Sequence, residues 1–230
     1  MLKVALALVL AFLGGAVGLS WQLDRLSKQA GVERWNPPRE DVMTAIATDF
    51  DVLLADAFWI KFLQYNGEKL TEDWQTRKFD NLFPGFRLIT ALDPRFQDAY
   101  IFGSWVLGDA GEPDNAVKLV ELARERNPDL PWYPYQLGYL EMLYRKDNHA
   151  ASRAFFAAAA LFEKPPENLK MALKAKKMGA YLIEKADQTD IAVSAWRDIL
   201  RASRRLGDKR MIAIAENALR RLGVTDLPQD

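Results

Sequence analysis

The sequence predicts an all-α protein, in which an apolar N-terminal helix precedes a stack of antiparallel helix pairs. Three observations support this fold class. Apolar residues recur three and four positions apart nearly everywhere, whereas the alternation typical of β-strands is missing. One segment near the N-terminus, from Val4 to Trp21, carries no charged side chain. Finally, prolines and alanines recur at a fixed spacing, which equals the length of one unit in an array of helical repeats.

The composition predicts a folded chain and excludes several classes of site. Among the 230 residues, 50% are apolar and 27% are charged, which excludes intrinsic disorder. Lysine plus arginine and aspartate plus glutamate both number 31, so the net charge gives no support for nucleic-acid binding. The absence of cysteine excludes disulfides, thiolate metal sites and thiol nucleophiles.

The segment from Val4 to Trp21 predicts a transmembrane signal anchor. As a helix it would span about 27 Å, which reaches across a thin bilayer. Lys3 precedes the segment, and Trp21 stands where an interfacial aromatic residue is expected. We therefore expect a single-pass membrane protein with an extracytoplasmic body. The alternative is a signal peptide cleaved before Leu19, which would release a soluble protein.

Small residues within this segment predict close packing of the transmembrane helix on another helix. Gly14 and Gly18 form a GxxxG pair, and a second row of small residues lies beside it. The alternative is that signal sequences are rich in glycine and alanine for other reasons. The residues of the second row are Ala7, Ala11 and Gly15.

The remaining chain divides into helical regions separated by breaks. Asn36, Pro37 and Pro38 end any helix and mark a linker. The stretch from Glu40 to Tyr65 predicts one long helix, nearly apolar all round from Val52, and therefore buried or covered by a partner. The predicted regions are an anchor at 1–22, a linker at 23–39, a helix pair at 40–93, two repeats at 94–166, a helix pair with a capping helix at 167–223, and a tail at 224–230.

Two repeats are recognised by their spacing. Asp93-Pro94 is followed by Asn127-Pro128, and Ala116 is followed by Ala150 at the same distance along the chain. A proline stops the second helix of each unit, and small residues let neighbouring helices approach. Two units cannot bury their apolar faces alone, so the flanking helices must complete the stack.

These repeats resemble the tetratricopeptide repeat, a helix–turn–helix unit whose length equals the spacing between Pro94 and Pro128. Tyr100, Ala116, Ala123 and Pro128 match its pattern in the first unit, and Leu137-Gly138 with Ala150 and Ala157 match it in the second. The stretches ADAFWIKFLQY and LITALDPRFQDAY are similar to membrane-anchored tetratricopeptide proteins of bacteria. The resemblance implies an α-solenoid, a location at the bacterial inner membrane with a periplasmic body, and a function in holding other proteins.

The sequence shows no pattern that predicts catalysis. It contains no phosphate-binding loop, nucleophile elbow, zinc-protease motif or acidic calcium loop. The single histidine, His149, lies in a predicted turn beside Asp147, where a solvated surface residue is expected. We therefore expect no catalytic residue, metal or cofactor, and no small-molecule or nucleic-acid ligand.

The first helix of each repeat predicts a protein-binding groove, because these helices line the concave side in tetratricopeptide arrays. Tryptophan and tyrosine there supply the rigid contact area that dominates binding. We expect a non-enzymatic membrane-tethered scaffold that binds a partner protein, a subunit of a membrane or envelope complex that it helps to assemble or stabilise. The alternative is a structural subunit of a multi-subunit membrane complex, packed permanently through its transmembrane helix and its long apolar helix. The groove residues are Asp98, Ile101, Trp105, Asp109, Trp132, Tyr135, Tyr139 and Met142.

Overall fold

A computed structural model describes residues 35–226 except 74–76 and 165, together with Gly18, Gln22 and Arg25. Every regular element within these residues is a helix, which confirms the all-α prediction. The α-helices are α2 (Glu40–Ala47), α3 (Asp51–Leu70), α4 (Leu82–Leu92), α5 (Gln97–Asp109), α6 (Pro113–Arg126), α7 (Trp132–Leu140), α8 (Asn148–Phe162), α9 (Leu169–Lys185), α10 (Thr189–Arg205) and α11 (Lys209–Arg221).

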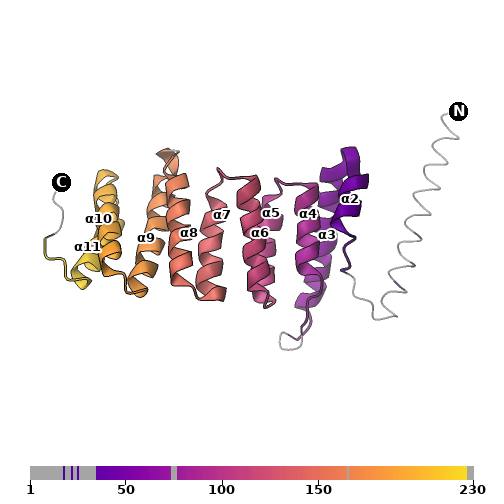
Figure 1. Ribbon diagram of the computed structural model, residues 1–230, viewed down its shortest axis with the longest axis horizontal. Helices are drawn as coiled ribbons and strands as arrows, with labels where there is room; N and C mark the ends of the chain where they lie inside the picture. Colours follow the sequence, from indigo (N-terminus) through magenta and orange to yellow (C-terminus); the bar gives the residue numbers. More distant parts are fainter. Residues whose placement is uncertain are drawn as a thin grey trace.

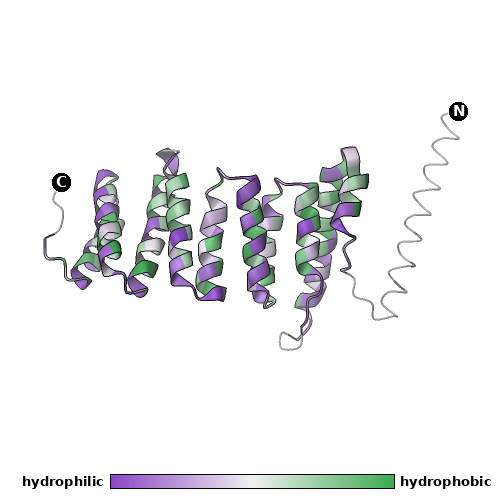
Figure 2. Ribbon diagram, viewed as in Figure 1, coloured by the Kyte–Doolittle hydropathy of each residue, from purple (hydrophilic) through white to green (hydrophobic). Residues whose placement is uncertain are grey.

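The helices stand side by side in one row (Figure 1). The row runs from α2 and α3 at the indigo end to α10 and α11 at the yellow end, and successive helices run in opposite directions. From α3 onward each helix packs on the next one along the chain, and α4 also contacts α6, as α5 contacts α7. Hydrophobic and hydrophilic residues alternate along the helices, as Figure 2 shows, so each helix buries one side against its neighbours.

The buried side chains form a core that follows the row. One large cluster extends from Trp35 through α3 to α7. A second cluster joins α9, α10 and α11, with Trp196 at its centre. Between them, alanines and phenylalanines of α8 pack on α9, including Phe155 against Leu182. The core therefore follows the row as a series of clusters.

At several helix glycines, an aromatic ring of a neighbouring element packs directly against the backbone. A Cβ added at Gly103 would lie 2.7 Å from the ring of Phe86, and one at Gly138 would lie 2.8 Å from Phe155. Real carbon atoms in contact stay about 3.5–4.0 Å apart. Glycine is therefore required here because the ring occupies the space of a side chain. The same close approach joins Gly85 to Trp35, Gly108 to Tyr144 and Gly179 to Phe156.

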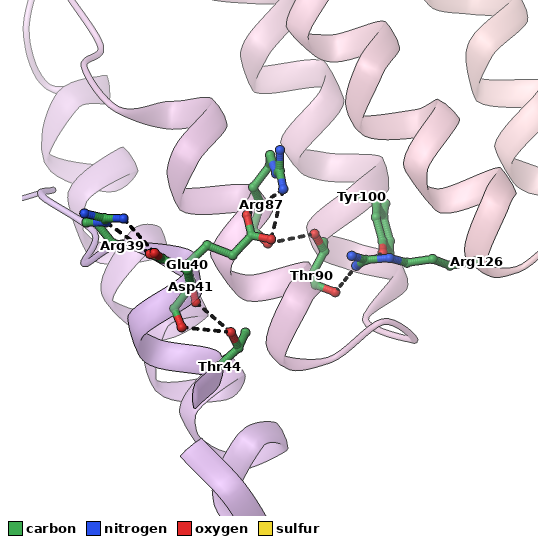
Figure 3. Close-up of polar contacts among 8 residues, drawn as sticks. All are labelled: Arg39, Glu40, Asp41, Thr44, Arg87, Thr90, Tyr100 and Arg126. Carbon is green, nitrogen blue, oxygen red and sulfur yellow. Dashed lines mark hydrogen bonds and ion pairs between the residues drawn. The ribbon is translucent and has the colours of Figure 1, made fainter. Parts of the chain in front are cut away.

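Polar contacts fix the N-terminal helices on the row (Figure 3). Arg87 of α4 forms an ion pair with Glu40 at the start of α2, with 2.8 Å between Nη2 and Oε2. Arg126, at the end of α6, donates to the carbonyl oxygen of Thr90 and, over 3.2 Å, to the hydroxyl of Tyr100. These contacts link α2 to α4, and α6 to both α4 and α5.

The predicted long helix from Glu40 to Tyr65 is interrupted in the structure. A single 3-10 turn, Thr48–Phe50, separates α2 from α3, and α3 continues to Leu70. Thr48 has a φ of 46°, a conformation that β-branched residues rarely adopt. No glycine or proline marks this break, so the sequence pattern could not reveal it.

Helix α8 is shifted by one residue from the register predicted for the second repeat. The buried residues of α6 include Ala116, Val120 and Ala123, whereas their counterparts in α8 come one position later than the predicted spacing. The predicted Ala150 is half-buried and Ala157 is exposed, so these two assignments were wrong by one position. The cause is a π-helical turn, Glu141–Arg145, which inserts one residue after α7. The corresponding buried residues of α8 are Ala151, Phe155 and Ala158, among others.

The predicted location in a membrane is contradicted. In the part of the chain that the structure describes, no helix is both long enough and apolar enough to cross a bilayer. The longest, α3, has 20 residues but carries several charges, including Asp56 and Lys61. The segment from Val4 to Trp21, on which the prediction depended, lies outside the described residues apart from Gly18.

Candidate protein-binding face

Four of the predicted groove residues lie along α5. Asp98 and Asp109 are exposed at its two ends, and Ile101 and Trp105 are half-buried between them. They recur three or four residues apart, so one side of the helix carries all four. The opposite side of α5 is buried and includes Tyr100. The structure therefore places these four residues on the less buried side of α5, where Ile101 and Trp105 still pack against the edge of the core.

The other four predicted residues follow α7 and the π-helical turn. Trp132 begins the helix and is 44% exposed, which is high for a tryptophan. Tyr135, Tyr139 and Met142 are half-buried farther along the same side. Because α5 and α7 contact each other, the two sets of residues belong to neighbouring helices.

The rings on α5 and α7 contact one another in a continuous series. Trp132 meets Tyr135 edge to face, with 6.0 Å between ring centroids, and Tyr135 meets Tyr139 at 5.3 Å. Tyr139 in turn lies 6.2 Å from Trp105 on α5. Such edge-to-face pairs are favourable beyond the area that they bury. The predicted aromatic residues are therefore brought together by the structure.

A second layer of rings from α8 supports this series. Phe155 is fully buried 5.4 Å from Tyr135 and 5.1 Å from Tyr139. Phe162 is buried in the same way beneath Trp132, at 5.1 Å. Since the outer rings rest on buried rings, they are both part of the packing between helices and exposed on their outer edges. Tyr135 and Tyr139 therefore serve in packing between helices and also remain partly accessible at the surface.

Hydroxyl groups add polar positions to the surface. The Tyr135 and Tyr139 oxygens are 3.3 Å apart and share a hydrogen bond. Tyr144, in the π-helical turn, donates to the Oδ1 oxygen of Asp109 over 2.5 Å. Burial, together with these hydrogen bonds, raises the pKa values of Tyr135 and Tyr144. Both phenols therefore remain neutral in the physiological range and can exchange hydrogen bonds with a bound molecule.

The structure adds aromatic residues that the repeat register did not select. Phe102 is 39% exposed and lies 5.8 Å from Trp59 of α3. Tyr144 lies 6.0 Å from Trp105. Phe102 lies four residues after Asp98, so an i, i+4 pattern continued from Asp98 would have found it. The position of Tyr144 could not be predicted, because it depends on the π-helical turn. We call the whole set the aromatic face: Trp59, Phe102, Trp105, Trp132, Tyr135, Tyr139 and Tyr144.

The remaining candidate residues do not join this face. Ala7, Ala11, Gly14 and Gly15 lie outside the described residues. Gly18 is described as exposed and helical, and a Cβ there would meet no atom within 4 Å. His149 is exposed in the first turn of α8 rather than in the turn between the two helices of the repeat.

Comparison with known proteins adds no relative to this description. No protein-family model matches the chain, and no curated protein matches it.

Proposed function

We propose that this protein is a non-enzymatic scaffold that holds a partner protein against the aromatic face. The observation that carries the proposal is the exposed edge of Trp132 and Phe102 on a surface supported by buried rings. Rigid aromatic residues lose little conformational freedom on binding and are enriched among the residues that dominate interfaces. The hydroxyls of the tyrosines supply directional hydrogen bonds beside them.

We further propose that the row of helices is an α-solenoid of the tetratricopeptide kind. Antiparallel helices in one row, each packed on its chain neighbours, support this assignment. The spacing between the buried alanines of α6 and α8 supports it once the extra residue of the π-helical turn is counted. In such an array the first helices of the units line one side, which is where α5 and α7 carry their rings.

Photo-cross-linking in the cell of origin tests the proposed binding. A photoreactive phenylalanine analogue replaces Trp132, and in a control chain it replaces Leu206, which has similar exposure at the end of α10. We expect a discrete cross-linked protein from position 132 and none from position 206. Equal products from both positions, or none from 132, would contradict the proposal.

Alanine substitution then measures the contribution of the face. Because Trp132 is half exposed, Trp132→Ala should weaken binding of the captured protein by about 1–4 kcal/mol while the chain remains folded. Tyr139→Ala removes a ring that packs on Phe155 and should cost stability as well as binding. Titration calorimetry and thermal melts of both variants separate these effects. Unchanged affinity of a folded Trp132→Ala variant would place the binding site elsewhere.

A further inference from the structure

A second surface, distinct from the aromatic face, exposes more apolar side chains than a solvated helix does. Most of the large exposed apolar residues of the described chain lie between residues 42 and 70. Soluble monomers rarely leave such a contiguous set uncovered, and larger patches mark interaction sites. The set consists of Val42, Ile46, Phe50, Val52, Leu53, Ile60, Leu63 and Leu70.

The outward side of α3 repeats with the spacing of a coiled-coil seam. The buried side of the helix carries Ala55, Phe62 and Asn66. Opposite these, exposed residues follow one another at intervals of three and four positions, the pattern by which helices pair with other helices. Leu53 is 64% exposed and Ile60 is 56% exposed within this pattern. We call the following residues the α3 seam: Leu53, Ala57, Ile60, Gln64 and Gly67 of α3, with Phe50 in the preceding 3-10 turn.

The opposite end of the row has a different character and cannot complete the seam. Helix α11 exposes cationic side chains on its outer side. An array of repeats needs such a polar outer face at an uncovered end. Helix α11 has one, whereas α3 exposes Leu53 and Ile60 among its polar residues. Contact of α11 with the seam would bury its cations against leucine and isoleucine, which is unfavourable. The cations are Lys209, Arg210, Arg220 and Arg221.

We propose that the α3 seam binds the α3 seam of a second copy of this chain, with the two helices parallel about a two-fold axis. In a parallel coiled coil, the residue just before a seam residue of one helix lies opposite the residue five positions later in the other helix, which comes just after a seam residue. Asp56 of each copy then faces Lys61 of the other, so opposite charges meet twice. In an antiparallel pair, the residues that precede seam residues would lie opposite one another in the two helices, so Asp56 would not face Lys61.

The polar seam residue supports the same register. Gln64 lies at a core position, where one buried polar residue fixes register and orientation in coiled coils. In a parallel pair it faces Gln64 of the second copy, and each amide can donate to the other and accept from it. A shifted or antiparallel pair would leave this amide against an apolar side chain, at a cost in free energy.

Pairing through the seam joins helices that are already formed. An isolated coiled coil of this length would be marginal, since about three or four heptads are usual. Here α3 is already folded on α4, so pairing does not have to supply the cost of helix formation.

Disulfide trapping tests the partner and its direction, because the chain has no cysteine of its own. In the full chain, Gln64→Cys should form a disulfide-linked dimer under mild oxidation, since residue 64 faces itself in a parallel pair. Leu53→Cys/Gln64→Cys should gain no 53–64 cross-link between copies. Ala157→Cys, on the exposed side of α8, is the control for random collision. Dimer yield no higher than in this control, a 53–64 link, or capture of another protein at position 64 would overturn the proposal.

Charge exchange provides a second test that does not depend on cysteine chemistry. Asp56→Lys and Lys61→Glu each place like charges opposite one another, and each should raise the dimer dissociation constant severalfold in sedimentation equilibrium. The double variant Asp56→Lys/Lys61→Glu restores opposite charges and should recover the original constant. Both side chains are exposed, so folding should persist in all three chains. Additive weakening in the double variant would overturn the parallel arrangement.

Discussion

The contact between Gly138 and Phe155 predicts that adding a single methyl group destabilises the protein. In Gly138→Ala, the new Cβ would lie 2.8 Å from two atoms of the Phe155 ring. Relief to an ordinary contact requires a shift of about 1 Å. The ring is fully buried and is covered by Tyr135 and Tyr139, so it has little room to move.

The magnitude follows from two opposing effects. Overpacking of a tight core costs about 1–3 kcal/mol. Replacing glycine by alanine within a helix recovers about 0.5–1 kcal/mol, because the unfolded chain loses freedom. The free energy of unfolding should therefore fall by about 1 kcal/mol, and by at most about 2.5 kcal/mol, in Gly138→Ala.

Gly67 provides a matched control within the same protein. It lies inside α3, in the α3 seam, and within one copy of the chain a Cβ there would meet no atom within 4 Å. Both variants are therefore melted as monomers, at concentrations below the dimer dissociation constant. Gly67→Ala should therefore stabilise the chain by about 0.5–1 kcal/mol. The two variants should differ in melting temperature by roughly 1–14 °C for a chain of this size, measured by circular dichroism. The reasoning would be refuted if Gly138→Ala melted at or above the temperature of Gly67→Ala.

Two other groups give predictions on stability. Burial raises the pKa of the Glu141 carboxyl above its usual 4.5, so this group favours folding most at low pH and progressively less as the pH rises through its folded-state pKa. Glu141→Gln removes that dependence, so thermal melts from about pH 4 to about pH 7 should show the midpoint of the variant rising relative to wild type. Asp208 caps α11 by accepting a 3.0 Å hydrogen bond from the Met211 amide. Asp208→Ala should lower stability by about 1 kcal/mol, with hydrogen exchange fastest in α11; uniform loss of protection along the chain would contradict a local cap.

Much of the helical architecture follows from sequence patterns that act locally. Amphipathic spacing and helix-ending prolines predicted the helices, and the positions of Pro94 and Pro128 predicted the repeat of units. The aromatic residues of α5 and α7 were also found, since their three- and four-residue spacing identifies one side of a helix. These features depend on hydrogen bonds and contacts within a few residues, which a single sequence records.

The features that sequence reasoning missed depend on contacts between distant residues. The π-helical turn brings Tyr144 over Gly108 and moves Ala151 and Ala158 into the core. No residue type within Glu141–Arg145 indicates that this turn contains an extra residue. The break at Thr48 similarly allows α2 to reach Arg87 on α4. In both cases a tertiary contact stabilises a local geometry that propensity alone does not favour.

The single row of helices has a consequence for how the chain acquires its structure. Most contacts join elements that are neighbours along the chain, so only short loops must close before each contact forms. Chains with such local contacts fold in microseconds to milliseconds, and their order of assembly can follow synthesis from the ribosome. We expect α3 to pack on α4 while the C-terminal helices are still being made, with α10 and α11 the last to join.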